Sequence, residues 1–184
     1  MPAPTRVAVV VGSLRKESFN RKLALAIKAT APASMTLDIV EIGQLPLYNQ
    51  DDDANPPAAS VAFKEQIAAA GAVLFVTPEY NRSVPGVLKN AIDWVSRPPE
   101  PPFDGKPVAI MGAATGLLGT ARAQYDLRKM FVFMNGHVLN KPEVMIGQAA
   151  TRFDAEGRLT DATTRDLIVA QLGALRDWTR RLNG

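Results

Sequence analysis

Runs of apolar residues alternate along the chain with segments whose apolar residues recur at helical spacing. Val7 to Val11 and Ala72 to Thr77 are continuous apolar runs, as in strands buried on both faces. Phe19 to Ala31 instead carries apolar residues three and four positions apart, which is typical of an amphipathic helix. By the same criteria we expect further strands at 36–42, 107–111 and 137–140, and further helices at 61–70, 84–95, 120–134 and 161–182.

The order of these elements predicts the fold class. Strand and helix alternate five times, which indicates an α/β fold: a doubly wound, five-stranded parallel sheet with helices on both faces. We find no internal repeat and no linker, so residues 1–184 are expected to form a single domain. Ligands of such sheets bind at the carboxyl ends of the strands. The loops after the first, third and fourth strands are therefore the candidate sites.

The first of these loops, residues 12–20, has the character of an anion site. It leaves a buried strand and enters a helix, whose first N–H groups and positive dipole end attract phosphate. Gly12 allows the turn, while Ser13, Ser18 and Asn20 can donate hydrogen bonds and Arg15 can add a charge-assisted contact. The alternative is an ordinary turn in which Ser18 caps the helix.

Two common nucleotide motifs are absent from this loop. No Gly-Lys-Ser/Thr follows at the spacing of a Walker A motif, and the second and third glycines of Gly-x-Gly-x-x-Gly are missing. Glu41, at the end of the second strand, could imitate the ribose-binding acid of a nicotinamide fold, but the missing glycines argue against that interpretation.

The other two loops offer places for a flat ring. Residues 78–86 include Tyr80, whose face beside polar backbone suits a planar heterocycle; alternatively, Ser83 caps a helix and Tyr80 is an exposed aromatic. Residues 113–120 are small and include two glycines, so a ligand could approach the backbone closely; alternatively, the segment is a flexible turn capped by Thr120. Together the three loops suit a mononucleotide with a planar ring.

Composition narrows the remaining classes of function. The chain has no cysteine, which excludes a disulfide scaffold and a thiol nucleophile and fits a cytoplasmic protein. The net charge is +3 with the basic residues scattered, so we expect no nucleic-acid partner. Met1 to Thr5 lacks signal-peptide features, and no apolar run could span a membrane. Asp51 to Asp53 has no second group of ligands, and we expect no metal site there.

The residues of these loops resemble the NADPH-dependent FMN reductase family, which includes quinone and chromate reductases. The resemblance covers nearly the whole chain, and its second motif is long and specific. It implies a flavodoxin-like fold, bound FMN and a homodimer or homotetramer. The residues that carry it are Gly12-Ser13-Leu14-Arg15 with Ser18 and Asn20, Pro78-Glu79-Tyr80-Asn81 with Ser83, Pro85-Gly86, and the run from Leu88 to Trp94.

The resemblance also implies roles for individual residues. Besides Gly12, which makes the turn, it assigns the phosphate end of FMN to Ser13, Arg15, Ser18, Phe19 and Asn20, and the isoalloxazine to Pro78, Glu79, Tyr80 and Asn81. Thr115 and Gly116 match the third loop less closely. Many relatives have Ser-Pro-Gly or Ser-x-Gly where this chain has Ala114-Thr115-Gly116.

The implied activity is hydride transfer from NADPH or NADH to bound FMN, followed by reduction of a small-molecule acceptor such as a quinone, an azo compound, chromate or free flavin. The flavin does the redox chemistry, so no catalytic side chain is expected. His137 lies beyond the three loops and is expected to be structural or exposed. Two alternatives stay open: a non-enzymatic electron carrier of the flavodoxin type, which would usually be acidic, and a flavin-free nicotinamide enzyme.

One apolar stripe allows two interpretations. Leu88, Ile92, Trp94 and Val95 share the side of a helix that would face the core. Alternatively, Trp94 and Val95 extend to a partner subunit, because aromatic residues are enriched at interfaces. Polar residues of the next helix could then complete the contact, namely Arg122, Gln124, Tyr125 and Arg128.

Overall fold

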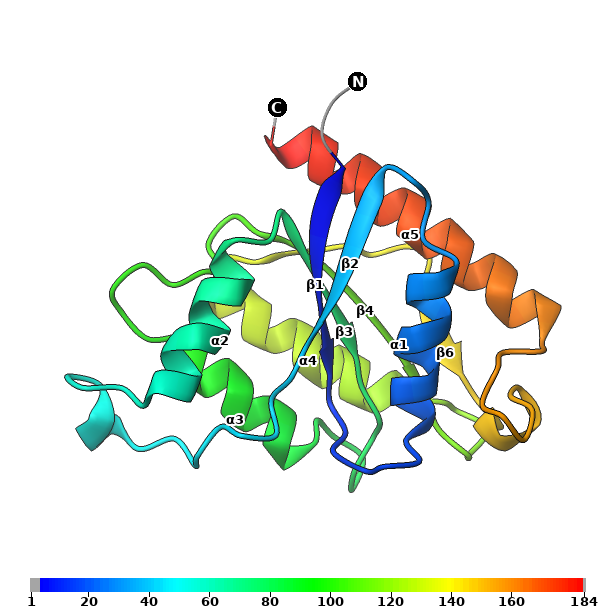
Figure 1. Ribbon diagram of the computed structural model, residues 1–184, viewed down its shortest axis with the longest axis horizontal. Coiled ribbons are helices and arrows are strands. Elements are labelled where there is room, and N and C mark those ends of the chain that lie inside the picture. Colours follow the sequence, from blue (N-terminus) through cyan, green and yellow to red (C-terminus); the bar gives the residue numbers. More distant parts are fainter. Residues whose placement is uncertain (1–3, 184) are drawn as a thin grey trace.

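The computed structural model describes residues 4–183, and a parallel sheet lies between two layers of helices (Figure 1). The strand order is β2-β1-β3-β4-β5, and β6 also pairs with β4. All pairs are parallel, as expected. Residues 1–3, on which the signal-peptide expectation partly rests, lie outside the described residues. The strands are β1 (Thr5–Val11), β2 (Met35–Val40), β3 (Ala72–Val76), β4 (Pro107–Ala113), β5 (His137–Val138) and β6 (Val144–Ile146).

Two short strands occupy the fifth position of the sheet, where the sequence predicted one. β5 pairs with the first residues of β4, and β6 pairs with its last residues, Met111 to Ala113. Pro142, which has no N–H for a ladder, lies in the gap between them. Backbone carbonyls between the two strands accept hydrogen bonds from side chains instead. Arg128 donates to the Leu139 carbonyl at 2.9 Å, and Gln171 donates to the Pro142 carbonyl at 2.7 Å.

The strand sequences explain why both faces carry helices. In β1, Val7, Val9 and Val11 face one side and Ala8 and Val10 face the other, and all are buried. A strand that is apolar on both faces must be covered on both. Helices α1 (Phe19–Ala29) and α5 (Ala162–Asn183) cover the first face. Helices α2 (Ala58–Ala68), α3 (Gly86–Val95) and α4 (Ala121–Phe133) cover the second.

Trp94 and Val95 belong to the core of their own chain, so the interpretation that they reach a partner subunit is wrong. Trp94 is only 4% exposed and Val95 is fully buried. The Trp94 indole N–H donates to the Pro46 carbonyl at 2.7 Å, and its ring meets that of Tyr48 edge-on at 5.1 Å. The chain's own loop after β2 therefore covers this side of α3.

The carboxyl ends of the strands lie along the lower edge of the molecule in Figure 1. The loops after β1, β3 and β4 gather there, while β1 begins and α5 ends at the upper edge. His137 pairs with Pro107, the first residue of β4, and so lies at the edge away from these loops. Among residues 4–183, no helix combines the length and the apolar character needed to cross a bilayer.

Candidate functional site

The three loops meet in a cleft of about 150 Å³. This is smaller than the cavities that usually enclose a whole small molecule, so a mononucleotide here would place one end in the cleft and the remainder on its rim. Gly12, Asn81 and Gly116 are the predicted site residues that do not line the cleft. Its lining consists of Ser13, Arg15, Ser18, Phe19, Asn20, Pro78, Glu79, Tyr80, Ala113, Ala114 and Thr115.

Two buried serines, Ser13 and Ser18, bring hydroxyl groups to the cleft. Ser18 is the N-cap of α1, and its hydroxyl accepts the Arg21 N–H at 3.4 Å. The Ser13 hydroxyl accepts the Arg15 N–H, also at 3.4 Å. Each hydroxyl therefore keeps its own O–H to donate to a ligand. The first N–H groups of α1 point to the same place, so the donors suit a phosphate with two negative charges.

Arg15 and Phe19 together form one wall of the cleft. The Arg15 guanidinium donates to the Glu17 carbonyl at 2.9 Å and lies 6.0 Å from the centre of the Phe19 ring. This places a cation at the mouth of the cleft. Lys22 approaches the same ring at 5.8 Å and pairs with Glu17, and the hydrogen bond from Lys22 lowers the pKa of that carboxyl.

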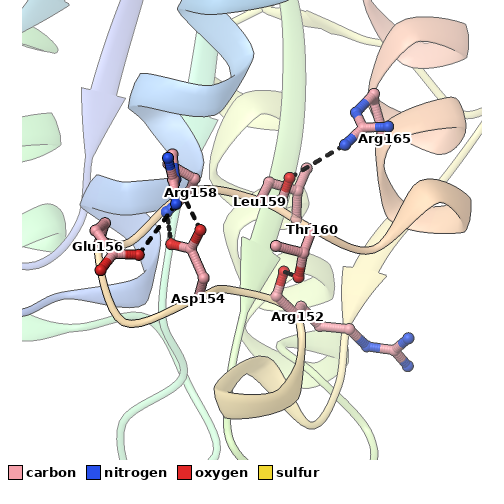
Figure 2. Close-up of polar contacts among 7 residues, drawn as sticks. All are labelled: Arg152, Asp154, Glu156, Arg158, Leu159, Thr160 and Arg165. Carbon is pink, nitrogen blue, oxygen red and sulfur yellow. Dashed lines mark hydrogen bonds and ion pairs between the residues drawn. The ribbon is translucent and has the colours of Figure 1, made fainter.

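A hairpin between β6 and α5 supports this wall. Figure 2 shows its polar contacts, in which Arg158 is paired with Asp154 and Glu156. The Phe153 ring of the hairpin lies 5.9 Å from the Phe19 ring. Residues 152–160 thus pack against the start of α1, although they are more than a hundred positions from it in sequence.

Asn20 faces the cleft, but its carboxamide binds the protein. The Nδ2 group donates to the Ala113 carbonyl and Oδ1 accepts the Ala113 N–H, both at 2.9 Å. The side chain therefore joins the start of α1 to the end of β4. A contact from the Asn20 side chain to a phosphate would have to use the second Nδ2 hydrogen, whereas the Asn20 backbone N–H belongs to the first turn of α1.

The second loop is a tight turn with Tyr80 beside the cleft. Tyr80 and Ser83 exchange both backbone hydrogen bonds, at 3.1 and 3.0 Å. Asn81 and Arg82 between them both have positive φ, of 49° and 66°. Such a turn favours asparagine at its first position, which gives Asn81 a conformational role. The Tyr80 side chain is 49% exposed, so a ring could stack on it at the rim.

Glu79 directs its carboxylate at helix α4 rather than into the cleft. Oε2 accepts the N–H groups of Arg122 at 3.0 Å and Ala123 at 3.2 Å, and Oε1 pairs with the Arg122 guanidinium at 3.2 Å. A second hydrogen bond joins the same loop to α4, since the Ser83 hydroxyl donates to Asp126 at 2.8 Å. Hydrogen bonds from Lys129 and Ser83 lower the pKa of Asp126, so this carboxylate stays charged.

Glycine has a packing role at the base of the cleft. A side chain at Gly12 would meet Leu88 and Thr77, each at 3.0 Å, so this position must stay small for the first loop to pack on the second. Around Gly116, by contrast, there is open space. Thr115 and Gly116 are both exposed, but only Thr115 lines the cleft.

Sequence reasoning missed the residues that join the loops. Ala113 and Ala114 line the cleft with backbone, and Asp126 and Arg122 hold the second loop from α4. Alanine carries no chemical signal, so the small-residue loop was the only available hint at Ala113 and Ala114. Asp126 could have been found only by knowing that α4 packs beside Ser83.

Comparisons with known proteins cover nearly the whole chain. A family model described as NADPH-dependent FMN reductase matches residues 5–151. The chain is 54% identical over 181 residues to an NAD(P)H-dependent FMN reductase of Pseudomonas aeruginosa, covering 97% of each chain. It is 47% identical over 176 residues to a 2-hydroxy-1,4-benzoquinone reductase of a Burkholderia species, covering 95% of this chain and 96% of that one.

A solved structure is also similar to this chain over nearly its whole length. FerB of Paracoccus denitrificans, a flavoenzyme NAD(P)H:(acceptor) oxidoreductase, superposes with a TM-score of 0.88 and 38% identity. The match covers 96% of this chain and 98% of that chain. No large segment of the fold is therefore peculiar to this protein.

Proposed function

Since this chain belongs to the NADPH-dependent FMN reductase family, we propose that it passes electrons from NADPH or NADH through FMN to a small quinone. The chain is an oxidoreductase of that family, and FMN is its cofactor. The quinone is supported by relatives named quinone reductase, at 49% identity in Pseudomonas putida and 44% in Escherichia coli. Azo compounds, chromate and free flavin are further candidate acceptors.

One observation supports the cleft as the FMN site above all others. The buried hydroxyls of Ser13 and Ser18 keep their protons for a ligand at the start of α1, and the half-exposed Tyr80 lines the same cleft. The phosphate would be held by the serines, by Arg15 and by the helix, and the isoalloxazine would lie between Tyr80 and Thr115. FMN, when bound, accepts and donates the hydride. The residues bind it and orient it.

The test begins with the colour of the purified protein. Wild type is expected to be yellow, or to take up FMN, and to bleach under anaerobic conditions with NADPH or NADH. Addition of a benzoquinone is then expected to restore the yellow colour. A protein that binds FMN but does not bleach would favour the electron-carrier alternative, which no relative named above supports. A protein that never binds FMN would overturn the proposal.

We also propose that α4 joins this chain to a second copy of itself. Tyr125, Val132 and Phe133 of this helix are 53%, 84% and 89% exposed, which is unusual for large apolar side chains in a helix. Sedimentation is expected to show a dimer or tetramer at micromolar concentration, and Val132→Glu is expected to shift it toward monomer. A wild-type monomer would end the proposal. A cytoplasmic location fits the nicotinamide donor and stays a prediction.

A further inference from the structure

The third loop, residues 114–120, carries the rim on which a flavin ring would rest, yet most of its side chains give it little support. Thr120 at its end is the exception, because it is fully buried and accepts from Gln124 at 2.9 Å. Thr115, Gly116, Leu117 and Leu118 are all exposed. The loop is also held by the end of β6 and the segment after it, since Ala114 donates to the Ile146 carbonyl at 2.9 Å and Gln148 donates to the Gly116 carbonyl at 3.1 Å. The position of this rim relative to the other two loops needs separate contacts.

Those contacts come from the other two loops, one at each end of the third. At the start, Asn20 from the phosphate side holds both backbone groups of Ala113. At the end, Glu79 from the Tyr80 loop holds the first N–H groups of α4, at Arg122 and Ala123. The Glu79 side chain is only 11% exposed, and its charge meets the positive end of the helix and the Arg122 guanidinium.

We propose that Asn20 and Glu79 are positioning residues. They fix the two ends of the third loop to the other two loops, and in this way they set the distance between the rims of the flavin site. This inference rests on the proposed function. It differs from the sequence-based expectation, which gave the Asn20 side chain a direct hydrogen bond to the phosphate and placed Glu79 along the isoalloxazine. Glu79 offers the flavin only its backbone, because its carboxylate is committed to α4, and Asn20 acts through Ala113.

The test uses Glu79→Ala, Glu79→Gln and Asn20→Ala, with a matched control for each position. Asp161 also caps a helix and pairs with an arginine, accepting from Thr164 at 2.8 Å and from Arg152 at 2.7 Å, but it does not line the cleft. Asn90 also makes a two-way carboxamide contact, with Tyr48 and Pro46, each at 2.8 Å. Asp161→Ala and Asn90→Ala therefore remove the same chemistry elsewhere.

Three measurements are compared: amide hydrogen exchange of the FMN-free protein, the Kd for FMN, and the visible circular dichroism of FMN-saturated protein. We expect Glu79→Ala and Asn20→Ala to speed exchange at residues 113–123, weaken FMN binding about tenfold or more, and change the flavin dichroism. Glu79→Gln is expected to lie between them and wild type, because an amide oxygen still accepts without the charge. The two controls are expected to keep the FMN affinity and dichroism of wild type.

The outcomes separate this inference from the proposed function. Wild type that binds no FMN overturns the proposed function and this inference with it. Wild type that binds FMN, beside Glu79 and Asn20 variants with unchanged affinity, dichroism and exchange, overturns the inference alone. If Glu79→Ala does not fold, Glu79→Gln takes its place in this comparison. Wild-type affinity, dichroism and exchange in Glu79→Gln would then overturn the inference.

Discussion

Replacing Ser18 with alanine separates the two roles of this hydroxyl. Its oxygen caps α1 by accepting the Arg21 N–H, and its proton is available to a phosphate. The cap bond is long, at 3.4 Å, so its loss is expected to cost near the lower end of the range for N-caps, about 0.5 kcal/mol of folding free energy. Loss of a hydrogen bond to a charged phosphate costs more, about 1.5–3 kcal/mol.

The expected result is therefore a selective loss of FMN. Flavin-free Ser18→Ala is expected to unfold at nearly the denaturant concentration of wild type, while its Kd for FMN rises by about ten- to a hundredfold. At an FMN concentration of about 100 times the wild-type Kd, FMN adds about 2.7 kcal/mol to the stability of wild type. At the same concentration a tenfold weaker variant gains only about 1.4 kcal/mol.

Urea unfolding with and without FMN measures the loss of folding free energy, and fluorescence titration of FMN measures the loss of FMN affinity. Ser60→Ala is the matched control, because Ser60 is also a buried serine in the first turn of a helix, where it donates to the Pro57 carbonyl at 2.7 Å. That variant is expected to lose stability without losing FMN affinity. Wild-type FMN affinity in Ser18→Ala would refute the phosphate assignment of this residue.

Three further predictions concern other parts of the chain. Arg15→Ala is expected to weaken FMN binding by about 1.5–3 kcal/mol, and an unchanged Kd in a fluorescence titration would remove Arg15 from the phosphate site. Phe131 is fully buried between Phe75 and Phe103, at ring distances of 5.4 and 5.2 Å, so Phe131→Ala is expected to cost about 3–5 kcal/mol in urea unfolding; a loss below 1 kcal/mol would contradict this packing. Hydrogen bonds from Thr164 and then Arg152 lower the pKa of Asp161, so its contribution to stability is present above the ordinary carboxyl range and is lost as the pH falls through the folded pKa. The stability difference between wild type and Asp161→Asn is therefore expected to shrink below about pH 4, and a difference that grows there would contradict this account.

The buried strands were the easiest part of the fold to predict. β1 and β3 are apolar at every position that faces either helix layer, and this pattern is local in the sequence. The split between β5 and β6 was missed, because three-residue strands such as Val144–Ile146 are too short to show a period. Trp94 was open to two interpretations because its cover, Pro46, lies 48 positions earlier in the chain.

In the site, too, features set by neighbouring residues could be predicted, and contacts between residues far apart in the sequence could not. Residues 12–20 were predicted to be an anion site because Ser13, Arg15 and Ser18 follow one another between a strand and a helix, and the structure places these three side chains in one cleft. The actual partners of Asn20 and Glu79 lie 93 and 43 positions away, and no pattern within one loop indicates them. Residue type suggested that the Asn20 side chain binds a phosphate, and the family resemblance placed Glu79 beside the isoalloxazine, whereas in the fold both side chains bind backbone groups of the protein.

The contacts between the three loops also affect how the protein would acquire its cofactor. They are made by the chain's own side chains and backbone, so the entropy of ordering the loops is lost when the polypeptide folds rather than when FMN arrives. Association is then expected to be a single fast bimolecular step, with a heat capacity change that reflects only the surface covered by the ligand. We expect that a site built in this way can be emptied and reloaded with flavin analogues, which would allow the redox group to be varied while the protein stays the same.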